Sequence, residues 1–434
     1  MASDRPELLR TRMRPTAAFS PSAPVTNKPL FAGRRRQIIE VMSAVTQAGQ
    51  HVALCGERGV GKTSLAAMIC EFWTDAFDHT SSDIAIRINC DAMDTFGSLW
   101  AKIAEELEIQ HEKKKISFGR DSVLFKAASQ EIVRGAARPN IVRRFLELSG
   151  KKLIIVDEFD RIRDEDTLRL MADTIKTLSD HLVETTLVLV GVADGVGDLI
   201  KEHTSIDRAL VQVLVPRMSA LELAEIVQTR LQLLGMNISD EALECIVNGS
   251  QGLPNYAHLL GLYAVGQVIE DQRRTIELDD ARATLKVASG NAHESIRLAY
   301  NRAAVSGGRG NLYKQVLLAC ARAPVDELGF FAPTDVNESM GRIMKKRYEI
   351  NAFVRHLNAL CTEAKGNILQ KSSVESVQRF RFADPLMKPY INLLGFAEGA
   401  IDGRTCRVEQ FGHRSRLSAV TPNGSLRNGF LPGS

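Results

Sequence analysis

The side chains with the clearest chemical potential are a lysine and a threonine that follow closely spaced glycines. The glycines let the backbone form a concave nest of N–H donors, Lys62 can reach the β- and γ-phosphates of a nucleotide, and the Thr63 hydroxyl can bind Mg²⁺. The pattern G-x-x-x-x-G-K-[ST] is matched at each fixed position. The stretch therefore predicts a nucleoside triphosphate site with Mg²⁺, formed by Gly56, Glu57, Arg58, Gly59, Val60, Gly61, Lys62, Thr63 and Ser64.

Two adjacent carboxylates, Asp157 and Glu158, end an apolar run of strand type. This is the arrangement of a Walker B motif downstream of a phosphate loop. Asp157 is expected to hold Mg²⁺ together with Thr63, and Glu158 is expected to orient and deprotonate the attacking water. The two motifs together predict hydrolysis of the bound triphosphate.

Two further residues stand where they could act on the γ-phosphate. Asp194 ends another apolar run, so it is expected either to read the γ-phosphate through a water or a metal ion, or to cap the helix that follows. Arg208 lies in the turn before the last apolar run. From there its guanidinium can project toward a nucleotide bound by a neighbouring subunit, although an arginine in such a turn also commonly forms a surface ion pair.

The elements that position these residues alternate between strands and helices. Nearly continuous apolar runs, which are typical of buried parallel strands, occur near residues 51–55, 84–90, 153–158, 186–194 and 211–215, with helical periodicity between them. The predicted fold class is therefore α/β, with a P-loop parallel sheet sandwiched by helices. Residues 108–138 are polar and poorly periodic, so they are expected to form an excursion from that core.

The rest of the chain divides into segments of different character. Strand patterns stop after residue 218, which predicts a helical lid that ends in a glycine-rich linker. Three helical patterns and two short strands then follow, which is the order of a winged helix. The predicted domains are a nucleotide-binding domain at 29–218, a lid at 219–308 and a winged helix at 309–396, with disordered basic arms at 1–28 and 397–434.

In a winged helix the third helix enters the major groove of duplex DNA. Here it would present Arg355, His356 and Asn358. Other basic residues are expected to contact DNA from the segment before this helix and from the wing, namely Arg342, Lys345, Lys346, Arg347, Lys371, Arg379 and Arg381. The alternative is a winged helix that contacts a protein partner.

Composition limits the classes of protein that fit. With 44% hydrophobic and 25% charged residues among 434, the chain suits a soluble protein of several domains. Its seven cysteines include no C-x-x-C pair, so neither a disulfide framework nor a zinc site is indicated, and a reducing, cytoplasmic location is expected without a membrane span. The charges that sum to +3 are distributed unevenly along the chain, because basic residues predominate before residue 29 and after residue 308. This asymmetry favours double-stranded DNA as a partner of the ends.

The motifs also carry a family resemblance. They are F-A-G-R at 31–34, G-E-R-G-V-G-K-T at 56–63, V-D-E-F-D at 156–160, V-G-V-A-D at 190–194, S-I-D-R-A-L at 205–210 and G-L-P-N-Y-A-H at 252–258. Together they resemble an AAA+ ATPase of the branch that includes origin-recognition and helicase-loader proteins with their bacterial relatives. The resemblance implies ATP as the nucleotide, ATP hydrolysis, and a homo-oligomer or partner protein. Transposition-regulator, signalling and phage-defence ATPases share much of this core.

The resemblance also implies roles for individual residues. Phe31 to Arg34 would border the adenine, Asp194 would stand at the first sensor position, and Arg208 would be an arginine finger. At the lid sensor position this branch typically carries an arginine, whereas this chain has Asn255, so another residue such as Arg217 could substitute. Turnover of ATP is then expected to be slow.

Overall fold

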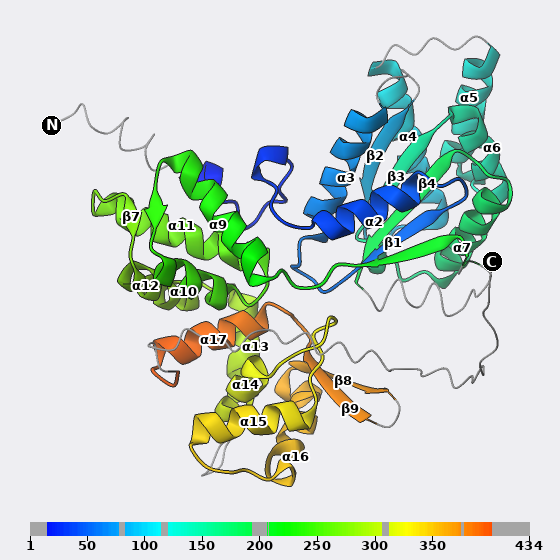
Figure 1. The fold of residues 1–434 in the computed structure, drawn as a ribbon. Coiled ribbons are helices and arrows are strands. Elements are labelled where there is room, and N and C mark those ends of the chain that lie inside the picture. Colours follow the sequence, from blue (N-terminus) through cyan, green and yellow to red (C-terminus); the bar gives the residue numbers. More distant parts are fainter. Residues whose placement is uncertain are drawn as a thin grey trace, which may run out of the picture.

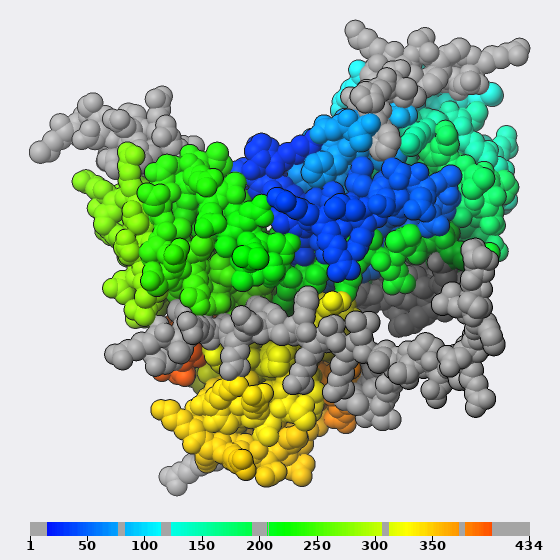
Figure 2. All heavy atoms as spheres, in the orientation of Figure 1, coloured from blue at the N-terminus to red at the C-terminus, as the bar shows by residue number. Residues whose placement is uncertain are grey.

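The computed structural model describes residues 15–77, 83–113, 120–192, 206, 208–305, 312–374 and 377–401. Three lobes are visible, which we name the sheet domain (residues 29–218), the lid (219–290) and the C-terminal module (294–401) (Figure 1, Figure 2). Within the described ranges, no helix is both long enough and apolar enough to cross a membrane.

Five parallel strands form the sheet in the order β2-β3-β4-β1-β5. Their bounds are His51–Cys55 (β1), Ile84–Asn89 (β2), Lys152–Asp157 (β3), Thr185–Gly191 (β4) and Leu210–Leu214 (β5). β1, β3 and β4 are buried along their whole length, which accounts for their nearly continuous apolar sequences. Because the strands are parallel, the phosphate loop after β1 and the carboxylates after β3 leave the sheet at the same edge.

Helices cover both faces of the sheet (Figure 1). One face is covered by α2 (Arg35–Val45) and α3 (Lys62–Phe77). The opposite face is covered by α4 (Phe96–Lys113), α6 (Pro139–Ser149) and α7 (Glu165–Asp180). The buried side chains of the first face continue into the lid as one cluster, so the lid is packed directly against α2 and α3.

The segment expected to be an excursion contributes to the core. α5 (Arg120–Glu131) and a helical turn of π type (Ile132–Ala136) follow α4. The Phe125 ring stacks on Phe145 at 5.1 Å between ring centroids and lies 4.6 Å from the His111 ring. The excursion prediction was therefore wrong for this part, because a few well-spaced aromatic residues bury a segment whose average composition is polar.

The lid consists of α9 (Ala220–Leu234), α10 (Asp240–Ser250), α11 (Pro254–Glu270) and α12 (Leu278–Gly290). Its first helix begins at a capping box of Ser219 and Glu222 and ends at Gly235 in the left-handed region. Two short parallel strands, β6 (Asn237–Ile238) and β7 (Thr275–Ile276), join the ends of these helices. Sequence patterns missed these strands because two residues are too few to show a period.

In the C-terminal module, the three helices α14 to α16 precede a hairpin, in the expected order. Its elements are α13 (Glu294–Ala304), α14 (Tyr313–Arg322), α15 (Pro333–Met344), α16 (Ile350–Leu360), β8 (Leu369–Val374), β9 (Val377–Phe382) and α17 (Met387–Ala397). β8 and β9 pair antiparallel. α13, placed in the lid range by sequence, shares its buried side chains with this module. α17 packs on both α12 and α14, so it joins the module to the lid.

The N-terminal segment departs from the expected disordered arm from residue 15 onward. Residues 15–18 form a helical turn, and Phe19 is fully buried. Its ring lies 6.2 Å from the His258 ring, centroid to centroid, and a Cβ atom on Gly261 would lie only 2.3 Å from it. One aromatic side chain in a glycine notch anchors the segment, which composition averaged over 28 residues does not reveal.

Candidate nucleotide site

A cavity of about 680 Å³ opens at the carboxyl edge of the sheet, between the sheet domain, the lid and the N-terminal segment. The structure brings together in its lining most of the residues predicted from the nucleotide motifs. These are Phe31, Arg34, Arg58, Gly59, Val60, Gly61, Lys62, Thr63, Ser64, Asp157, Glu158 and Asn255. The cavity is therefore the only place where the two motifs and the lid meet in the described part of the chain.

The phosphate loop is held in shape by its own lysine. Gly59 and Gly61 have φ values of 87° and 94°, which side chains rarely adopt. Lys62 Nζ donates hydrogen bonds to the carbonyl oxygens of Gly56 at 2.9 Å and Glu57 at 2.8 Å. Burial lowers the pKa of Lys62, and Asp160 and Asp157 oppose the shift. A phosphate would replace two neutral acceptors by charged ones, so the loop favours a polyanion.

Gly56 and Glu57 lie behind the loop and do not line the cavity. A Cβ atom on Gly56 would lie 2.4 Å from the Val215 carbonyl oxygen, so a glycine is needed where the loop leaves β1 beside β5. The Glu57 carboxylate accepts a hydrogen bond from Arg217 Nε at 2.7 Å. Arg217 is thereby held by Glu57 and is not placed in the cavity lining as a substitute for the lid arginine.

Asp157 offers a buried carboxylate oxygen to the cavity. Its Oδ1 accepts the N–H of Glu158 at 2.8 Å, whereas Oδ2 has no hydrogen-bond donor among the described residues, and the closest cation is Arg87, 3.9 Å away. Burial raises the pKa of Asp157, whereas the hydrogen bond from the Glu158 N–H and the nearby Thr63 hydroxyl oppose the shift. An unpartnered carboxylate oxygen beside a hydroxyl fits a divalent cation, so Thr63 and Asp157 suit Mg²⁺.

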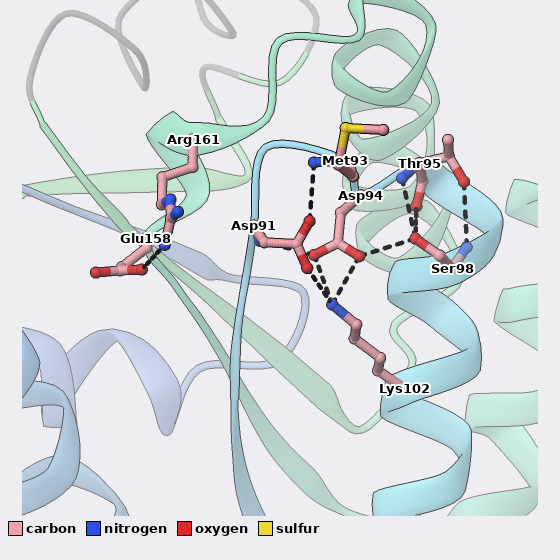
Figure 3. Close-up of polar contacts among 8 residues, drawn as sticks. All are labelled: Asp91, Met93, Asp94, Thr95, Ser98, Lys102, Glu158 and Arg161. Carbon is pink, nitrogen blue, oxygen red and sulfur yellow. Dashed lines mark hydrogen bonds and ion pairs between the residues drawn. The ribbon is translucent and has the colours of Figure 1, made fainter.

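Glu158 lies at the cavity, where its carboxylate forms an ion pair with Arg161. It has a φ of 56°, a left-handed conformation that costs energy in a residue with a side chain. Its Oε2 accepts a hydrogen bond from Arg161 Nη1 at 2.9 Å, in the short helical turn Phe159–Arg161. Figure 3 shows this pair beside a second network, in which Lys102 contacts both Asp91 and Asp94 on the loop after β2. This ion pair engages one of the two carboxylate oxygens of Glu158.

Arg34 is buried against the phosphate loop. Its Nη2 donates to the Val60 carbonyl at 2.7 Å, and its backbone N–H donates to Glu222 Oε1 at 2.8 Å. Burial lowers its pKa to about 10, and the nearby Glu222 opposes the shift. Arg34 thus joins the loop before α2, the phosphate loop and the lid at one point.

The lid contributes a neutral face and a second buried cation. The side-chain oxygen of Asn255 is buried without a donor among the described residues, and it lies 4.0 Å from a Cβ atom built on Gly59. Arg230 is 1% exposed and donates to the carbonyls of Ile226 and Leu30. Burial lowers its pKa to about 10. The pKa of His258 is lowered to about 3 by burial and by Arg230, so this histidine is neutral at physiological pH.

Residues 20–25 cross the mouth of the cavity as a strap between the lid and the sheet domain. At one end the Ser20 N–H donates to His258 Nδ1 at 3.2 Å. At the other end the Val25 N–H donates to the Ser64 hydroxyl at 3.0 Å. The strap therefore ties α11 to the first turn of α3, with the cavity beneath it.

Residues 45–198 match the sequence model of a family described as an AAA domain. The solved structure of a Walker-type ATPase of Pyrococcus abyssi superposes with a TM-score of 0.51 at 15% identity, covering 86% of this chain and 99% of that chain. The sheet domain has an AAA+ ATPase fold. Two other solved structures are similar at lower TM-scores. Cdc6p from Pyrobaculum aerophilum has 0.45 at 16% identity, covering 89% and 99% of the two chains, and the Aeropyrum pernix ORC1 protein in complex with DNA has 0.43 at 15%, covering 86% and 95%.

No curated protein sequence matches the chain. The P-loop and fold-class predictions are confirmed by the AAA+ fold and its five-stranded sheet. Asp194 lies outside the described residues, so the structure does not place it. Arg208 is exposed and lies just before β5, and its carbonyl accepts a hydrogen bond from Gln50. Because β5 runs parallel to β1, Arg208 lies at the edge of the AAA+ sheet opposite the phosphate loop, away from its own site.

The predicted DNA contacts of the C-terminal module do not form one face. Arg355 and Asn358 are exposed on α16, and Lys371 Nζ donates to the Asn358 side chain at 3.2 Å. Exposed positions before α16 are Arg342, Lys345, Lys346 and Arg347. His356, expected at the groove, is instead buried against Tyr313 with ring centroids 4.9 Å apart.

Arg379 and Arg381 point to the other side of the hairpin. They pair in register with Ser372 and Gln370, on the face opposite to Lys371 and the buried Phe380. Arg379 lies 3.3 Å from Asp326, and the Arg381 guanidinium stacks over Phe330 at 4.6 Å. Arg379 and Arg381 therefore lie on the strand face opposite to Lys371, because alternate residues of a strand face opposite ways, and the contact of these three residues with DNA stays a prediction.

Sequence reasoning missed the strap, Arg161, Arg230 and His258 in the AAA+ cavity. His258 lies within the motif at 252–258, and Arg161 follows the second carboxylate motif by one residue, so spacing could have indicated both. No sequence signal marks Arg230, whose role depends on how α9 packs beside residue 30.

Proposed function

We propose that this protein binds and hydrolyses ATP with Mg²⁺. The observation that carries the proposal is the convergence of Lys62, a buried Asp157 and Glu158 in one cavity of an AAA+ domain. The cavity also contains Arg34 and Arg230, two buried cations whose guanidinium groups are hydrogen-bonded only to neutral carbonyls among the described residues. A nucleoside triphosphate would supply charged acceptors where these guanidinium groups now have neutral ones.

Each residue has a distinct task in this proposal. Lys62 exchanges the carbonyls of Gly56 and Glu57 for phosphate oxygens. Thr63 and Asp157 hold Mg²⁺, which when bound neutralises charge on the phosphates. Glu158 leaves Arg161, orients a water and accepts its proton. The strap at residues 20–25 and the lid shield the nucleotide from bulk water.

The test compares two variants in which an uncharged glutamine replaces a glutamate. Glu158→Gln should lower ATP turnover by about 100-fold or more while ATP still binds, because a general base contributes a factor of this size. Glu184→Gln, an exposed residue next to β4, is the matched control and should turn over ATP as the wild type does. Equal rates for wild type and Glu158→Gln would remove Glu158 as the base.

We further propose that Arg208 acts on the nucleotide of a neighbouring subunit. Its place at the edge opposite its own phosphate loop supports action in trans only. Arg208→Ala should hydrolyse ATP poorly but bind it normally. Mixing Arg208→Ala with Glu158→Gln should restore turnover, since one mixed interface then contains both an intact Glu158 and an intact Arg208. If the mixture is as inactive as either variant alone, Arg208 is not a finger.

For the C-terminal module we propose nucleotide-controlled binding of duplex DNA. Its support is the order of three helices and a hairpin, with Arg355 exposed on α16 and Lys371 beside it. Anisotropy of a fluorescent duplex, titrated with the full chain at several salt concentrations, measures both affinity and salt slope. Arg355→Ala should lower the slope by about one unit. Arg169→Ala, an exposed cation of α7, should not.

A second candidate is a module that contacts a protein partner, as in signalling, transposition-regulator or defence ATPases. It is favoured by the engagement of Arg379 and Arg381 within the chain, which occupies two of the three cations expected on the wing. Absence of duplex binding at low salt would reject the DNA proposal. Association with a protein encoded nearby, lost in Lys62→Ala, would then favour this candidate.

A further inference from the structure

Glu57 connects the back of the phosphate loop to the rest of the molecule. Its side chain is 7% exposed, and its Oε2 accepts from Arg217 Nε at 2.7 Å. Arg217 in turn donates from Nη1 to the Gln251 carbonyl at 2.8 Å, in the turn that precedes α11 of the lid. The ion pair is therefore buried between the sheet domain and the lid, on the side of the loop away from the cavity.

A loop of the C-terminal module closely contacts the same carboxylate. The loop Asp326–Phe330, between α14 and α15, reaches toward the sheet domain as the yellow segment in both overall views (Figure 1, Figure 2). Gly329 has a φ of 80°, and a Cβ atom built on it would lie 1.6 Å from Glu57 Oε1. Any side chain at this position would displace Glu57, so the contact requires a glycine.

The loop is held by hydrogen bonds within itself and, through Phe331, by hydrogen bonds to the hairpin. Asp326 Oδ1 accepts the backbone N–H groups of Leu328 and Phe330, and its carbonyl accepts that of Gly329. Phe331 exchanges two backbone hydrogen bonds with Phe380 of β9, at 2.8 and 2.9 Å. These hydrogen bonds connect Gly329 to the hairpin.

A second contact from the same module flanks the loop. Leu386 lies 3.3 Å from a Cβ atom built on Gly59, and its carbonyl accepts from the Tyr256 hydroxyl at 3.1 Å. Two residues on, Lys388 is buried, donates to the Ala323 carbonyl at 3.0 Å, and lies within electrostatic range of Arg217 and Glu57. The C-terminal module thus touches the phosphate loop behind both Glu57 and Gly59.

We propose that the C-terminal module reads the state of the nucleotide site through the contact of Gly329 with Glu57. When Lys62 turns to phosphate, the Glu57 carbonyl loses a donor at 2.8 Å and its peptide is free to shift. The Glu57 side chain then moves against Gly329, and the hairpin follows. Because coupling between two sites is reciprocal, a substitution at Gly329 that favours one position of the Glu57 side chain over the other should alter nucleotide affinity. The inference rests on nucleotide binding at the cavity but not on hydrolysis or on DNA.

Hydrogen exchange of the full chain tests the coupling without any substitution at the contact. Addition of a saturating non-hydrolysable ATP analogue should change amide exchange at residues 326–331, far along the sequence from the phosphate loop. The Lys62→Ala protein, which should bind the analogue much more weakly and stay largely unbound at the same concentration, is the control. Binding of the analogue to wild-type protein with no change at 326–331 overturns the proposal.

Substitution from the module side tests the reverse direction. Gly329→Ala should weaken binding of a fluorescent ATP analogue by about fivefold or more. Gly135→Ala is the matched control, because Gly135 has a φ of 90° with open space around it and so carries the backbone strain without the contact. Adding Glu57→Ala to Gly329→Ala should recover part of the loss by removing the clash. Wild-type affinity in Gly329→Ala, or no recovery in the double variant, contradicts the proposal.

Failure of this inference differs from failure of the proposed function. If the wild-type chain binds no ATP analogue, the nucleotide site itself is rejected. If ATP binds and is hydrolysed but neither exchange at 326–331 nor affinity in Gly329→Ala changes, the AAA+ site stands and the coupling is rejected. Absence of duplex binding affects neither result.

Discussion

Three cations of the nucleotide cavity and two surface cations of the C-terminal module are held in opposite ways. In the cavity, Lys62, Arg34 and Arg230 are largely buried, and their hydrogen bonds go to backbone carbonyls. In the module, Arg342 and Arg379 are exposed and are paired with the carboxylates of Glu338 and Asp326. A buried cation with neutral acceptors gains from a bound anion, whereas an exposed cation with a carboxylate has already most of what a phosphate would give.

This difference gives a rule for ranking the two binding proposals. Burial already lowers the pKa of Lys62 and of Arg34 at the cavity, and both side chains donate hydrogen bonds to backbone carbonyls there, so binding of a polyanion offsets part of a cost that folding has incurred. At the module a nucleic acid must compete with solvent and with local acids. The cavity should therefore bind its ligand tightly, and the module should bind weakly and with strong dependence on salt.

The largest effect is expected from Lys62→Ala. The substitution removes the side chain that contacts the carbonyls of Gly56 and Glu57 in the loop. The binding free energy of ATP should weaken by about 2 to 5 kcal/mol, as for truncation in a buried charged contact. Arg58→Ala, a second cation of the same loop, is the control and should cost less. Isothermal titration calorimetry with ATP and Mg²⁺ measures both. Similar losses in the two variants would mean that general positive charge, and not the position of Lys62, determines affinity.

The next effect is expected from Phe19→Ala. Phe19 is fully buried, and emptying its notch should cost about 3 kcal/mol locally, which detaches the strap from α11. ATP should then dissociate faster, since the strap at residues 20–25 lines the cavity. Stopped-flow displacement of a fluorescent analogue measures the rate. An unchanged rate, with residues 15–25 more open to proteolysis, would show that the strap does not retain nucleotide.

The nucleotide site was largely readable from sequence because its key residues are consecutive. A phosphate loop needs glycines, a lysine and a hydroxyl in a fixed order, and the parallel sheet then brings Asp157 to the same edge. The sequence did not indicate which residues from distant segments of the chain complete the site. Ser20, Arg230 and His258 line the cavity from segments far apart in the chain, and only packing brings them together.

The C-terminal module shows the limit of counting charges. Its elements were predicted in the correct order, since periods of 3.6 and 2 are visible over eight to twelve residues. The faces on which the basic side chains lie were not predicted. The register of β8 with β9 and the position of the loop Asp326–Phe330 decide where Arg379 and Arg381 point. Burial of His356 likewise depends on Tyr313, 43 positions earlier, and no local pattern shows it.

A smaller effect, on stability, is expected from the buried Lys388. Burial, and then the charge of Arg217, lower its pKa to about 7, whereas Glu57 and Cys320 raise it. Between pH 7 and 10.5 the unfolded chain binds this proton and the folded protein does not, so unfolding free energy should rise with pH in that window, by up to about 1.4 kcal/mol per pH unit. Lys388→Met should lose this slope. Urea unfolding at about pH 7 and about pH 9 measures it, and an equal slope in both proteins contradicts the prediction.

The smallest effect, and the sharpest for the comparison, is expected from Arg379→Ala. If only the α16 face meets DNA, this substitution should change the salt slope of duplex binding by much less than the one unit expected for Arg355→Ala. It should instead loosen the loop, because Asp326 loses a partner 3.3 Å away, and amide exchange at residues 326–331 should rise. A full one-unit change for Arg379→Ala would mean that Arg379 leaves Asp326 for phosphate. The module would then resemble the cavity in exchanging internal partners for a ligand, and the contrast between the two regions would be one of solvent exposure alone.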